Sequence, residues 1–464
     1  MRLGGRAVFA AGFTALAAAL GGLAGLSGPA IAGATAAPAV PQATVIIHPD
    51  VLHVAKGSKQ PPTTAQCEAA YKIACYEPGQ VQQAYNLPLL YNRGVNGTGT
   101  TIVIVDSFGS PTIGHDLKVF DQQFGLPAPP SLKIIQPAGR VPRYNPKNSD
   151  MVGWAGETNL DVEYAHTIAP NARILLVETP VSETEGVQGF PEIVKAENYV
   201  INHHMGDVIS QSFGATEETF PSPFSIYKLR SAFINAAAHN VTVLGGSGDF
   251  GATDYELNLQ DLYPYRVNSW PSSDPLVTSV GGTQLDLDDA GNRLSPDVVW
   301  NDCCGAGGGG VSAVFSRPFF QNSVRGVVGN RRGTPDISLS ASVDGFVWVR
   351  DTADPSAHWY GVGGTSEATP LFAGIVAMAD QLAGHRLGFI NDDLYRMAQS
   401  WHGSGIVDVT QGNNSYGPFT NTDGNTYTVT GYTAGHGYDL ASGLGTIDGA
   451  KFVRALARSG GWGF

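Results

Sequence analysis

Three short segments of the sequence carry side chains that could cleave an acyl bond together. In the first, residues 363–366, two glycines and Thr365 lead to Ser366 at the start of a long apolar segment typical of a helix. A serine in that place can attack a carbonyl group, because nearby N–H groups and the helix dipole favour the negative charge that develops. The same serine could instead serve as an N-cap, with Pro370 in the first turn. This segment predicts a nucleophile or a helix cap.

The second segment pairs two acids. Glu157 and Asp161 are four residues apart, a spacing that places both carboxyl groups on one face of a helix. If the pair is buried, one proton is retained and the two groups titrate as a unit. Such a pair can act as a general base in acid, whereas a solvated acidic face is the structural alternative.

The third segment, residues 247–251 (SGDFG), follows an apolar strand that ends at Leu244. A carboxyl group among glycines at a strand end can point into a cleft, and a protonated Asp249 could donate a hydrogen bond to an oxyanion. An aspartate between glycines also forms ordinary turns. Asp249 is therefore either a candidate oxyanion donor or a turn residue.

Apolar runs alternate with helical segments along most of the chain, and they indicate how these side chains are positioned. Such alternation predicts an α/β protein with a doubly wound, mostly parallel sheet flanked by helices. In these sheets, ligand and catalytic groups lie at the carboxyl ends of the strands. Residues 250–362 are irregular and glycine-rich, and no repeat is present. We expect strands at 101–106, 133–136, 172–178, 207–212 and 241–244, and helices at 115–124, 157–167, 191–204, 223–239 and after Gly364.

Composition excludes several classes of protein. The chain has 464 residues, with 27 Lys+Arg against 40 Asp+Glu, a formal net charge of −13 and 59 glycines. Without a Lys/Arg cluster to neutralise phosphates, a nucleic-acid binder is excluded as the default. An apolar content of 42% is too high for a disordered chain. The composition suits a compact, loop-rich enzyme.

The N-terminus predicts export. Arg2 and Arg6 precede an uncharged Ala/Gly/Leu-rich stretch with small residues before Ala32 and Ala36, the pattern of a secretory signal peptide over residues 1–36. An uncleaved anchor is the alternative, although glycines and Pro29 interrupt the stretch. We expect a secreted, extracellular protein without membrane attachment in its mature form. Residues 37–80 are predicted to be a short leader or linker and residues 81–464 one catalytic domain.

The four cysteines suit an oxidising compartment. An even number is compatible with two disulfides, and four cysteines allow three connectivities. A bridge between Cys67 and Cys75 is sterically reasonable, whereas one between the neighbours Cys303 and Cys304 would be strained. One disulfide with two free thiols also stays open. A zinc site is disfavoured, because no Cys-x-x-Cys pair is present.

Taken together, the three segments resemble the sedolisin family of serine-carboxyl peptidases, relatives of subtilisin in which an acidic pair takes over the role of histidine. The family has a Gly-Thr-Ser motif with a proline four residues after the serine, a Glu-x-x-x-Asp pair and an aspartate in Ser-Gly-Asp-x-Gly. The resemblance covers residues 84–460 in the family's order and implies a subtilisin-like fold. The matching positions are Glu157, Asp161, Asp249, Gly364, Thr365, Ser366 and Pro370.

The resemblance implies a mechanism. Ser366 would attack the scissile carbonyl, Glu157 would take its proton and return one to the leaving amine, and Asp161 would hold and tune Glu157. A protonated Asp249 would stabilise the oxyanion, so we expect an acidic pH optimum. The implied activity is that of an endopeptidase or tripeptidyl-type peptidase acting on proteins or peptides, with the enzyme a monomer.

The resemblance also implies a calcium loop near the C-terminus. Calcium binds six to eight oxygens. The side chains of Asp408 and Asp439 with the carbonyls of Val409, Gly435 and Gly437 would supply five of them, with water completing the shell. Two unrelated turns are the alternative.

The chain departs from the family in two respects, and two other interpretations compete. Cys303 and Cys304 beside the glycines at 307–310 are unusual for the family and could alter specificity. The stretch before residue 84 is too short for the folded propeptide that typical members carry, which leaves the route of activation open. One rival is a subtilisin-type peptidase that uses Asp106, Ser366 and a histidine, for which His115 and His166 are the nearest candidates. The other is a secreted binding or scaffold protein on the same fold.

Overall fold

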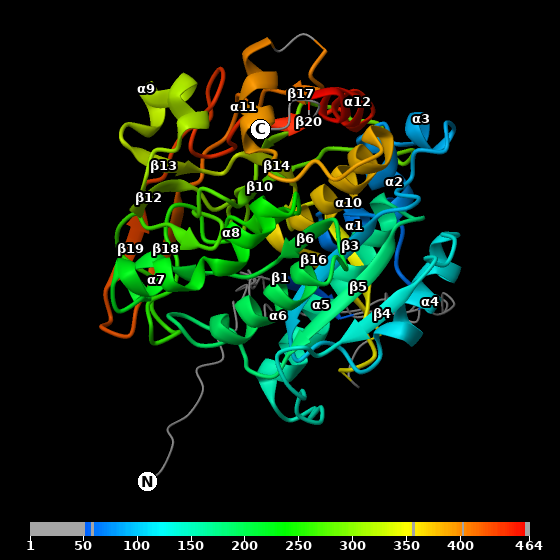
Figure 1. The fold of residues 1–464 in the computed structure, drawn as a ribbon, viewed down its shortest axis with the longest axis horizontal. Coiled ribbons are helices and arrows are strands. Elements are labelled where there is room, and N and C mark those ends of the chain that lie inside the picture. The colour runs from blue at the N-terminus through cyan, green and yellow to red at the C-terminus, as the bar shows by residue number, and fades with distance from the viewer. Residues whose placement is uncertain (1–51, 57–59, 355–357, 401–402, 460–464) are drawn as a thin grey trace, which may run out of the picture.

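The computed structural model describes residues 52–56, 60–354, 358–400 and 403–459 (Figure 1). The predicted signal peptide, residues 1–36, lies outside the described residues, as does the first part of the predicted leader. Within the described part of the chain, no helix has both the length and the apolar character needed to cross a membrane.

The centre of the fold is an eight-stranded sheet with strand order β11-β10-β8-β6-β3-β5-β4 and with β14 beside β10. Neighbouring strands are parallel except β10 and β11. The chain builds β5 and β4 on one side of β3 and β6 on the other, which creates a switch point at β3. The strands are β3 (Thr101–Ser107), β4 (Leu132–Ile135), β5 (Arg173–Thr179), β6 (Val208–Gln211), β8 (Thr242–Gly246), β10 (Thr278–Gln284), β11 (Val298–Val299) and β14 (Ile337–Ser340).

Helices cover both faces of this sheet (Figure 1). Side chains alternate along a strand, so Ile102 and Ile104 of β3 pack in the core with α5, α10 and α12, whereas Val103 and Val105 pack with α6 and α8. The predicted doubly wound α/β sheet is confirmed. The helices are α1 (Thr64–Tyr71), α2 (Pro78–Ala84), α3 (Pro88–Tyr91), α4 (Ile113–Phe124), α5 (Ser149–Ile168), α6 (Phe190–Asn202), α7 (Pro223–Leu229), α8 (Ser231–Ala238), α9 (Arg325–Val328), α10 (Thr365–Ala383), α11 (Asn391–Ser400) and α12 (Gly449–Ser459), with 3₁₀ turns η1 (Glu217–Thr219) and η2 (Phe319–Val324).

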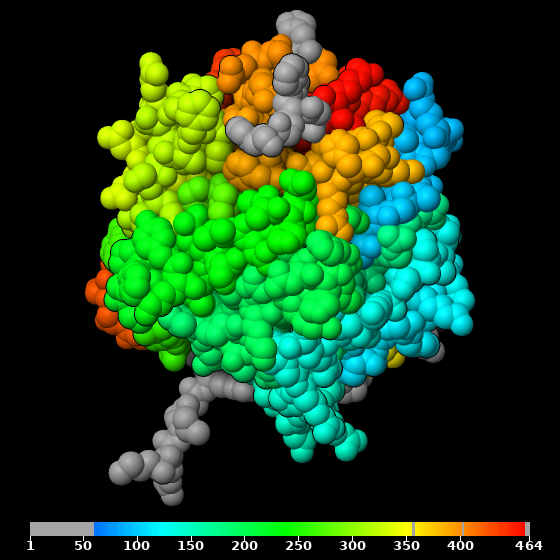
Figure 2. Space-filling view, viewed as in Figure 1, coloured from blue at the N-terminus to red at the C-terminus, as the bar shows by residue number. Residues whose placement is uncertain are grey.

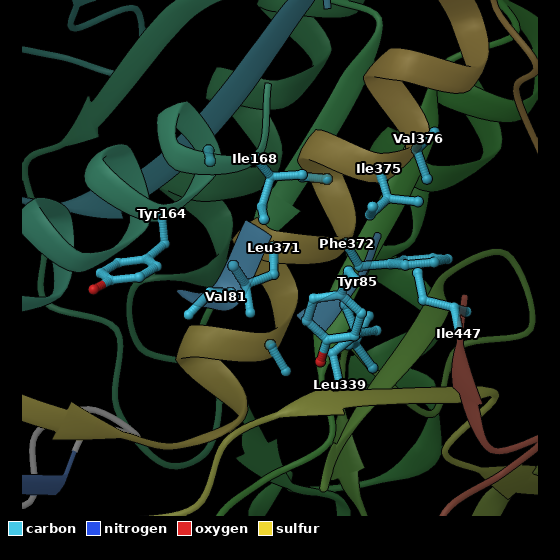
Figure 3. Close-up of a cluster of buried hydrophobic side chains, with 14 of the residues drawn as sticks. Val81, Tyr85, Tyr164, Ile168, Leu339, Leu371, Phe372, Ile375, Val376 and Ile447 are labelled. Carbon is cyan, nitrogen blue, oxygen red and sulfur yellow. The ribbon is translucent and has the colours of Figure 1, made fainter. Parts of the chain in front are cut away.

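Helices α5 and α10 cross at close range, which matters because they carry the candidate acids and the candidate nucleophile. Gly374 permits the approach, since a Cβ atom there would lie 2.6 Å from the Cβ of Ile168. Figure 3 shows Leu371 and Ile375 of α10 in the same apolar cluster as Tyr164 and Ile168 of α5. The core therefore fixes the two helices relative to each other.

Smaller sheets surround the centre. One has the order β1-β16-β15-β2, and its strand β16 leads directly into α10. Figure 2 shows α2 and α3 (blue) on one side of the molecule and the segment around α9 (yellow-green) on the opposite side. The remaining strands are β1 (Leu52–Lys56), β2 (Cys75–Tyr76), β7 (Ala215–Thr216), β9 (Ser269–Trp270), β12 (Gly310–Ser316), β13 (Arg331–Thr334), β15 (Phe346–Arg350), β16 (Trp359–Gly363), β17 (Ile406–Val407), β18 (Tyr416–Thr420), β19 (Thr426–Val429) and β20 (Thr446–Ile447).

Several element predictions need correction. Helix α5 begins at Ser149 instead of residue 157, because the Asn148 side chain accepts hydrogen bonds from the backbone N–H groups of Asp150 and Met151 and caps an earlier start. The single helix expected at 223–239 is two helices that meet at Arg230. The segment predicted as a loose leader contains β1, α1 and β2. The irregular region 250–362 contains β10 and β14, which belong to the central sheet, and strands that form the antiparallel pairs β12–β13 and β15–β16.

Both cysteine pairs form disulfides. Cys67 bonds to Cys75, joining α1 to β2, and Cys303 bonds to Cys304 in the loop between β11 and β12. Among the described residues no cysteine is free. The open alternative of two free thiols is therefore corrected, since the structure pairs the neighbouring cysteines as well.

Candidate active site

Asp249 is hydrogen-bonded to Thr365, the residue directly before Ser366. The chain turns after β8, and Asp249 Oδ1 accepts hydrogen bonds from the backbone N–H of Thr365 at 2.7 Å and from its hydroxyl at 2.9 Å. The Thr365 hydroxyl in turn accepts a hydrogen bond from the N–H of Gly248 at 3.1 Å. Thr365 is the first residue of α10 and Ser366 the second. The turn after β8 and the N-terminus of α10 are therefore locked together.

Burial changes the chemistry of Asp249. The side chain is fully buried, and burial raises its pKa to about 8, with the negative charges of Asp254 and Asp302 acting in the same direction and the hydrogen bonds from Thr365 opposing it. Its second oxygen, Oδ2, is buried without a hydrogen-bond partner among the described residues. A protonated Asp249 thus has a donor available beside Ser366.

The acidic pair lies in the middle of α5. Glu157 and Asp161 are both fully buried, which excludes the solvated acidic face. Asp161 Oδ1 accepts a hydrogen bond from Ser212 Oγ at 2.7 Å, and the same Oγ lies 3.4 Å from the backbone carbonyl oxygen of Ser366. Ser212 follows β6 and therefore joins α5 to the N-terminus of α10.

A third buried acid lies beside this pair at the carboxyl end of β3. Burial raises the pKa of Asp106 to about 7, with a hydrogen bond from Thr158 opposing this effect and the charge of Glu178 adding to it. Burial also raises the pKa of Asp161 well above its usual value, with the charge of Asp106 as the second cause and the hydrogen bond from Ser212 opposing both. Charges that repel one another in a low-dielectric site favour protonated carboxyl groups. The site thus holds protons that solvated acids would release.

Close backbone approach requires glycine on the turn after β8. Gly248 has a φ of +108°, a conformation that other residues rarely adopt, and a Cβ at Gly246 would lie 3.1 Å from the Thr365 hydroxyl. The backbone conformation at Gly248 and the close approach of Gly246 to Thr365 therefore explain why glycines surround Asp249.

No model of a protein family matches the chain, but individual proteins do. It is 33% identical to kumamolisin of Bacillus sp. (strain MN-32) over 398 residues, which is 83% of this chain. It is 32% identical to sedolisin of Pseudomonas sp. (strain 101) over 389 residues, or 81% of this chain. The solved structure of Pseudomonas sedolisin (serine-carboxyl proteinase) complexed with two molecules of pseudo-iodotyrostatin superimposes with a TM-score of 0.69 at 28% identity, covering 84% of this chain and all of that one.

The chain belongs to the sedolisin family of serine-carboxyl peptidases. It spans less than two thirds of the curated relatives it matches, 64% of kumamolisin and 61% of sedolisin.

In this sedolisin-family chain two further groups connect predicted residues: Ser212, which the sequence patterns did not single out, and Thr365, which they included only as part of the Gly-Thr-Ser motif. Ser212 links Asp161 to Ser366, and Thr365 links Asp249 to the same helix. Asp106 entered the sequence interpretation only as part of a subtilisin-type triad, yet here it is charge-coupled to Asp161. The sequence signal that could have identified these two residues was their position, since Asp106 and Ser212 lie at the carboxyl ends of neighbouring parallel strands.

Histidines do not support the subtilisin-type alternative. His166 is fully buried, with Nε2 at 2.8 Å from the carbonyl oxygen of Pro127 and 3.2 Å from Asp121 Oδ1. His115 is exposed on α4. The imidazole of His166 therefore contacts α4 and the loop that follows it, and His115 lies on the exposed surface of α4.

Both candidate calcium-binding aspartates of this sedolisin-family chain contact residues 435–437. Gly437 N–H donates to both carboxylate oxygens of Asp408, at 3.2 and 3.1 Å, and Gly435 N–H donates to Asp439 Oδ2 at 2.9 Å. Burial raises the pKa of Asp439. Val409 is buried beside this loop. Carboxylate oxygens are ligands that Ca²⁺ prefers, and Asp408 and Asp439 each accept hydrogen bonds from the same segment, residues 435–437.

Proposed function

We propose that this protein is a secreted, monomeric serine-carboxyl peptidase that hydrolyses peptide bonds of proteins or peptides in acid, with residues 81–464 as its catalytic domain. Ser366 attacks the scissile carbonyl carbon, and Glu157 accepts the hydroxyl proton and delivers a proton to the leaving amine. Asp161 orients Glu157. Water then repeats these steps to release the acyl group from Ser366.

The observation that carries this proposal is the fully buried carboxyl of Asp249, which is hydrogen-bonded to Thr365, the residue before Ser366. A tetrahedral intermediate places a negative charge on the former carbonyl oxygen, and a preorganised donor in a water-poor site stabilises that charge. Because burial raises the pKa of Asp249 to about 8, its carboxyl group carries a proton throughout the acidic range. Oδ1 is occupied by Thr365, so Oδ2 is the oxygen that donates.

Ser212 gives the acidic pair its geometry. Its hydroxyl donates to Asp161 Oδ1, which fixes the carboxyl group of Asp161 on the face of α5 that also carries Glu157. A typical intramolecular hydrogen bond contributes about 0.5–1.5 kcal/mol net. Asp161 is thereby held in place while Glu157 exchanges protons.

Calcium has a structural role in the proposal. Asp408 and Asp439, with the carbonyl oxygens of Val409, Gly435 and Gly437, would hold the ion and tie the segment after β17 to the loop before β20. A bound ion would neutralise the charges of Asp408 and Asp439 and would take no part in bond cleavage.

The proposal is tested by incubating the purified protein with a denatured protein substrate at pH 3–4 and at pH 8. Ser366→Ala and Asp249→Ala are compared with Ser131→Ala and Asp289→Ala, which alter exposed side chains outside the site. We expect digestion in acid by the wild type and both controls, and loss in the two site variants.

The other outcomes separate the alternatives. Cleavage at pH 8 that survives Asp249→Ala would identify a subtilisin-type enzyme, and no cleavage under either condition would identify a scaffold protein. Mass spectrometry of the products distinguishes internal cleavage from stepwise release of tripeptides.

A further inference from the structure

The loop between β11 and β12 contains a turn, residues 302–304, whose contacts reach both sides of the candidate active site. The carboxylate of Asp302, the first residue of this turn, accepts hydrogen bonds from three segments of the chain. Oδ1 accepts hydrogen bonds from the N–H groups of Cys304 and Gly305, and Oδ2 accepts from Trp300 Nε1, Ser342 Oγ and the N–H groups of Val343 and Asp344.

The first connection leads to Asp249. Directly after the turn, Ala306 N–H donates to the carbonyl oxygen of Asp249 at 2.9 Å, and Gly251 N–H donates to the carbonyl oxygen of Ala306 at 2.8 Å. Gly308 N–H donates to the carbonyl oxygen of Gly248 at 2.7 Å. The backbone on both sides of Asp249 is therefore held by residues 306–308.

The second connection leads to Ser366. Asp302 holds Val343, and this loop after β14 packs on the glycines before the nucleophile. Gly364 N–H donates to the carbonyl oxygen of Ala341 at 2.6 Å, and a Cβ at Gly363 would lie 2.7 Å from that same oxygen. Asp302 is thus connected, through residues 341–343, to the segment that carries Ser366.

The disulfide of Cys303 and Cys304 stiffens this turn. Four consecutive glycines, residues 307–310, follow it, and glycine loses more backbone freedom on ordering than any other residue. A bond between neighbouring cysteines closes a small ring that restricts the backbone at the start of the glycine run. Cys303 is exposed and Cys304 is half-buried, so Cys303 Sγ is accessible to a soluble thiol.

We propose that the Cys303–Cys304 disulfide is a redox modification site that positions Asp249 and Ser366 through Asp302, and that a dithiol reductant opens it and lowers catalysis. The proposal rests on the proposed function. Asp302 and the two cysteines are positioning residues, because they act on the catalytic groups through the contacts above.

The reaction is a thiol–disulfide exchange. A thiolate of the dithiol attacks Cys303 Sγ, the S–S bond breaks, and Cys304 leaves as a thiolate that takes up a proton. The second thiol of the reductant, after losing a proton, attacks the sulfur that is bound to Cys303. Cys303 leaves as a thiolate and takes up a proton, and the reductant is released as its own disulfide. In total, two electrons and two protons pass to the protein.

Opening the turn has a defined effect on Asp249. The groups that face its carboxyl are Thr365, which donates to it, and Asp254, Asp302 and Tyr416, which are coupled to it by charge. Burial is the largest cause of its raised pKa. Looser packing of residues 306–308 would admit water and lower the pKa of Asp249. Asp249 would then lose its proton at a lower pH.

The first test does not depend on activity. The full-length protein is reduced with dithiothreitol at neutral pH, its new thiols are alkylated, and amide hydrogen exchange is compared with that of the oxidised protein. We expect alkylation of Cys303 and Cys304 and exchange at least about 5-fold faster in residues 247–251, 305–308 and 341–344, since opening weakens their shared hydrogen bonds. Absence of alkylation at these cysteines, or unchanged exchange, would overturn the proposal.

The second test measures catalysis. We expect reduction to lower kcat about 10-fold with KM changed less than about 2-fold, which corresponds to about 1.4 kcal/mol of lost transition-state stabilisation. The alkaline limb of the pH profile should move towards acid. Cys303→Ser/Cys304→Ser should reproduce both effects and no longer respond to reductant, whereas Cys67→Ser/Cys75→Ser should still respond.

The variants separate the possible failures. If reductant lowers kcat equally in Cys303→Ser/Cys304→Ser, the effect arises at Cys67–Cys75 and the proposal is wrong. If the oxidised wild type cleaves no peptide, the proposed function fails, and the exchange measurement alone decides whether the turn controls residues 247–251.

Discussion

Asp249 accepts two hydrogen bonds from Thr365, one from its backbone N–H and one from its hydroxyl, through the single oxygen Oδ1. This relationship leaves Oδ2 as the oxygen that can carry a proton towards substrate. It also joins the turn after β8 to the first residue of α10, so the candidate oxyanion donor and the candidate nucleophile move as one unit.

The state of Asp249 predicts the alkaline limit of activity. Its pKa is raised to about 8 by burial, and only the protonated form donates, so kcat/KM should fall as pH rises through about 8. In Asp249→Asn the amide oxygen can accept from Thr365 and the amide nitrogen donates at any pH. We expect this variant to lose the alkaline fall, and Asp249→Ala to lose about 10²–10³-fold in kcat. The pH dependence of kcat/KM between 3 and 9 is the measurement, and an Asp249→Asn profile with the wild-type fall would contradict the assignment.

Ser212 should control the protonation of Asp161. Its hydrogen bond lowers a pKa that burial raises, so Ser212→Ala should raise the pKa of Asp161 further and shift the acidic limb of the profile to higher pH. Loss of this hydrogen bond, worth about 1 kcal/mol, predicts a fall in kcat of about 5-fold. Ser279→Ala is the matched control, because the Ser279 hydroxyl is buried on β10 without a partner among the described residues. Equal profiles for the two variants would show that Ser212 has no such role.

Calcium removal should destabilise the protein. A ligand at 100 times its Kd stabilises the folded state by about 2.7 kcal/mol, so EDTA should lower Tm by roughly 3–6 °C and added Ca²⁺ should restore it. Asp408→Asn should have a lower Tm and respond weakly to EDTA, whereas Asp289→Asn should behave as the wild type. Differential scanning calorimetry measures these shifts, and an EDTA-insensitive melt would refute the site.

Buried acids predict that stability falls as pH rises. Burial raises the pKa of Glu197 to about 8, and that of Asp380 also to about 8. Between the ordinary pKa of an unfolded carboxyl and pH 8 the folded state binds more protons, so its stability is greatest in acid and is lost towards pH 8.

Glu197→Gln tests that slope. The amide does not titrate, so the decrease in Tm between pH 5 and pH 8 should be smaller than in the wild type by roughly 2–4 °C. Glu192→Gln on the same helix, where the side chain is half-buried, should keep the wild-type slope. Thermal melts across this pH range would contradict the expectation if the two variants have equal slopes.

Local patterns in the sequence were sufficient for much of the fold. Strand β3 and helix α4 are recognisable because an unbroken apolar run and a helical period are written in consecutive residues. The split between α7 and α8 was missed because it depends on a distant partner: Arg230, at the junction, forms hydrogen bonds to Asp274 at 2.5 and 2.9 Å. Two of the strands missed between residues 250 and 362 have distant partners, since β9 pairs with β7 and β15 with β2, whereas β12 and β13 contain glycine and give only a weak apolar pattern.

The sequence by itself determined the types and order of Glu157, Asp161, Asp249 and Ser366 and, through them, the family. Only the tertiary structure decided that Ser212 joins the acids to Ser366, and that one carboxylate at Asp302 joins the neighbouring cysteines to both sides of the site. It also decided which acids hold protons, because desolvation depends on what surrounds a side chain and not on its neighbours along the chain. Motifs are local, whereas burial and hydrogen-bond partners arise when distant segments pack together.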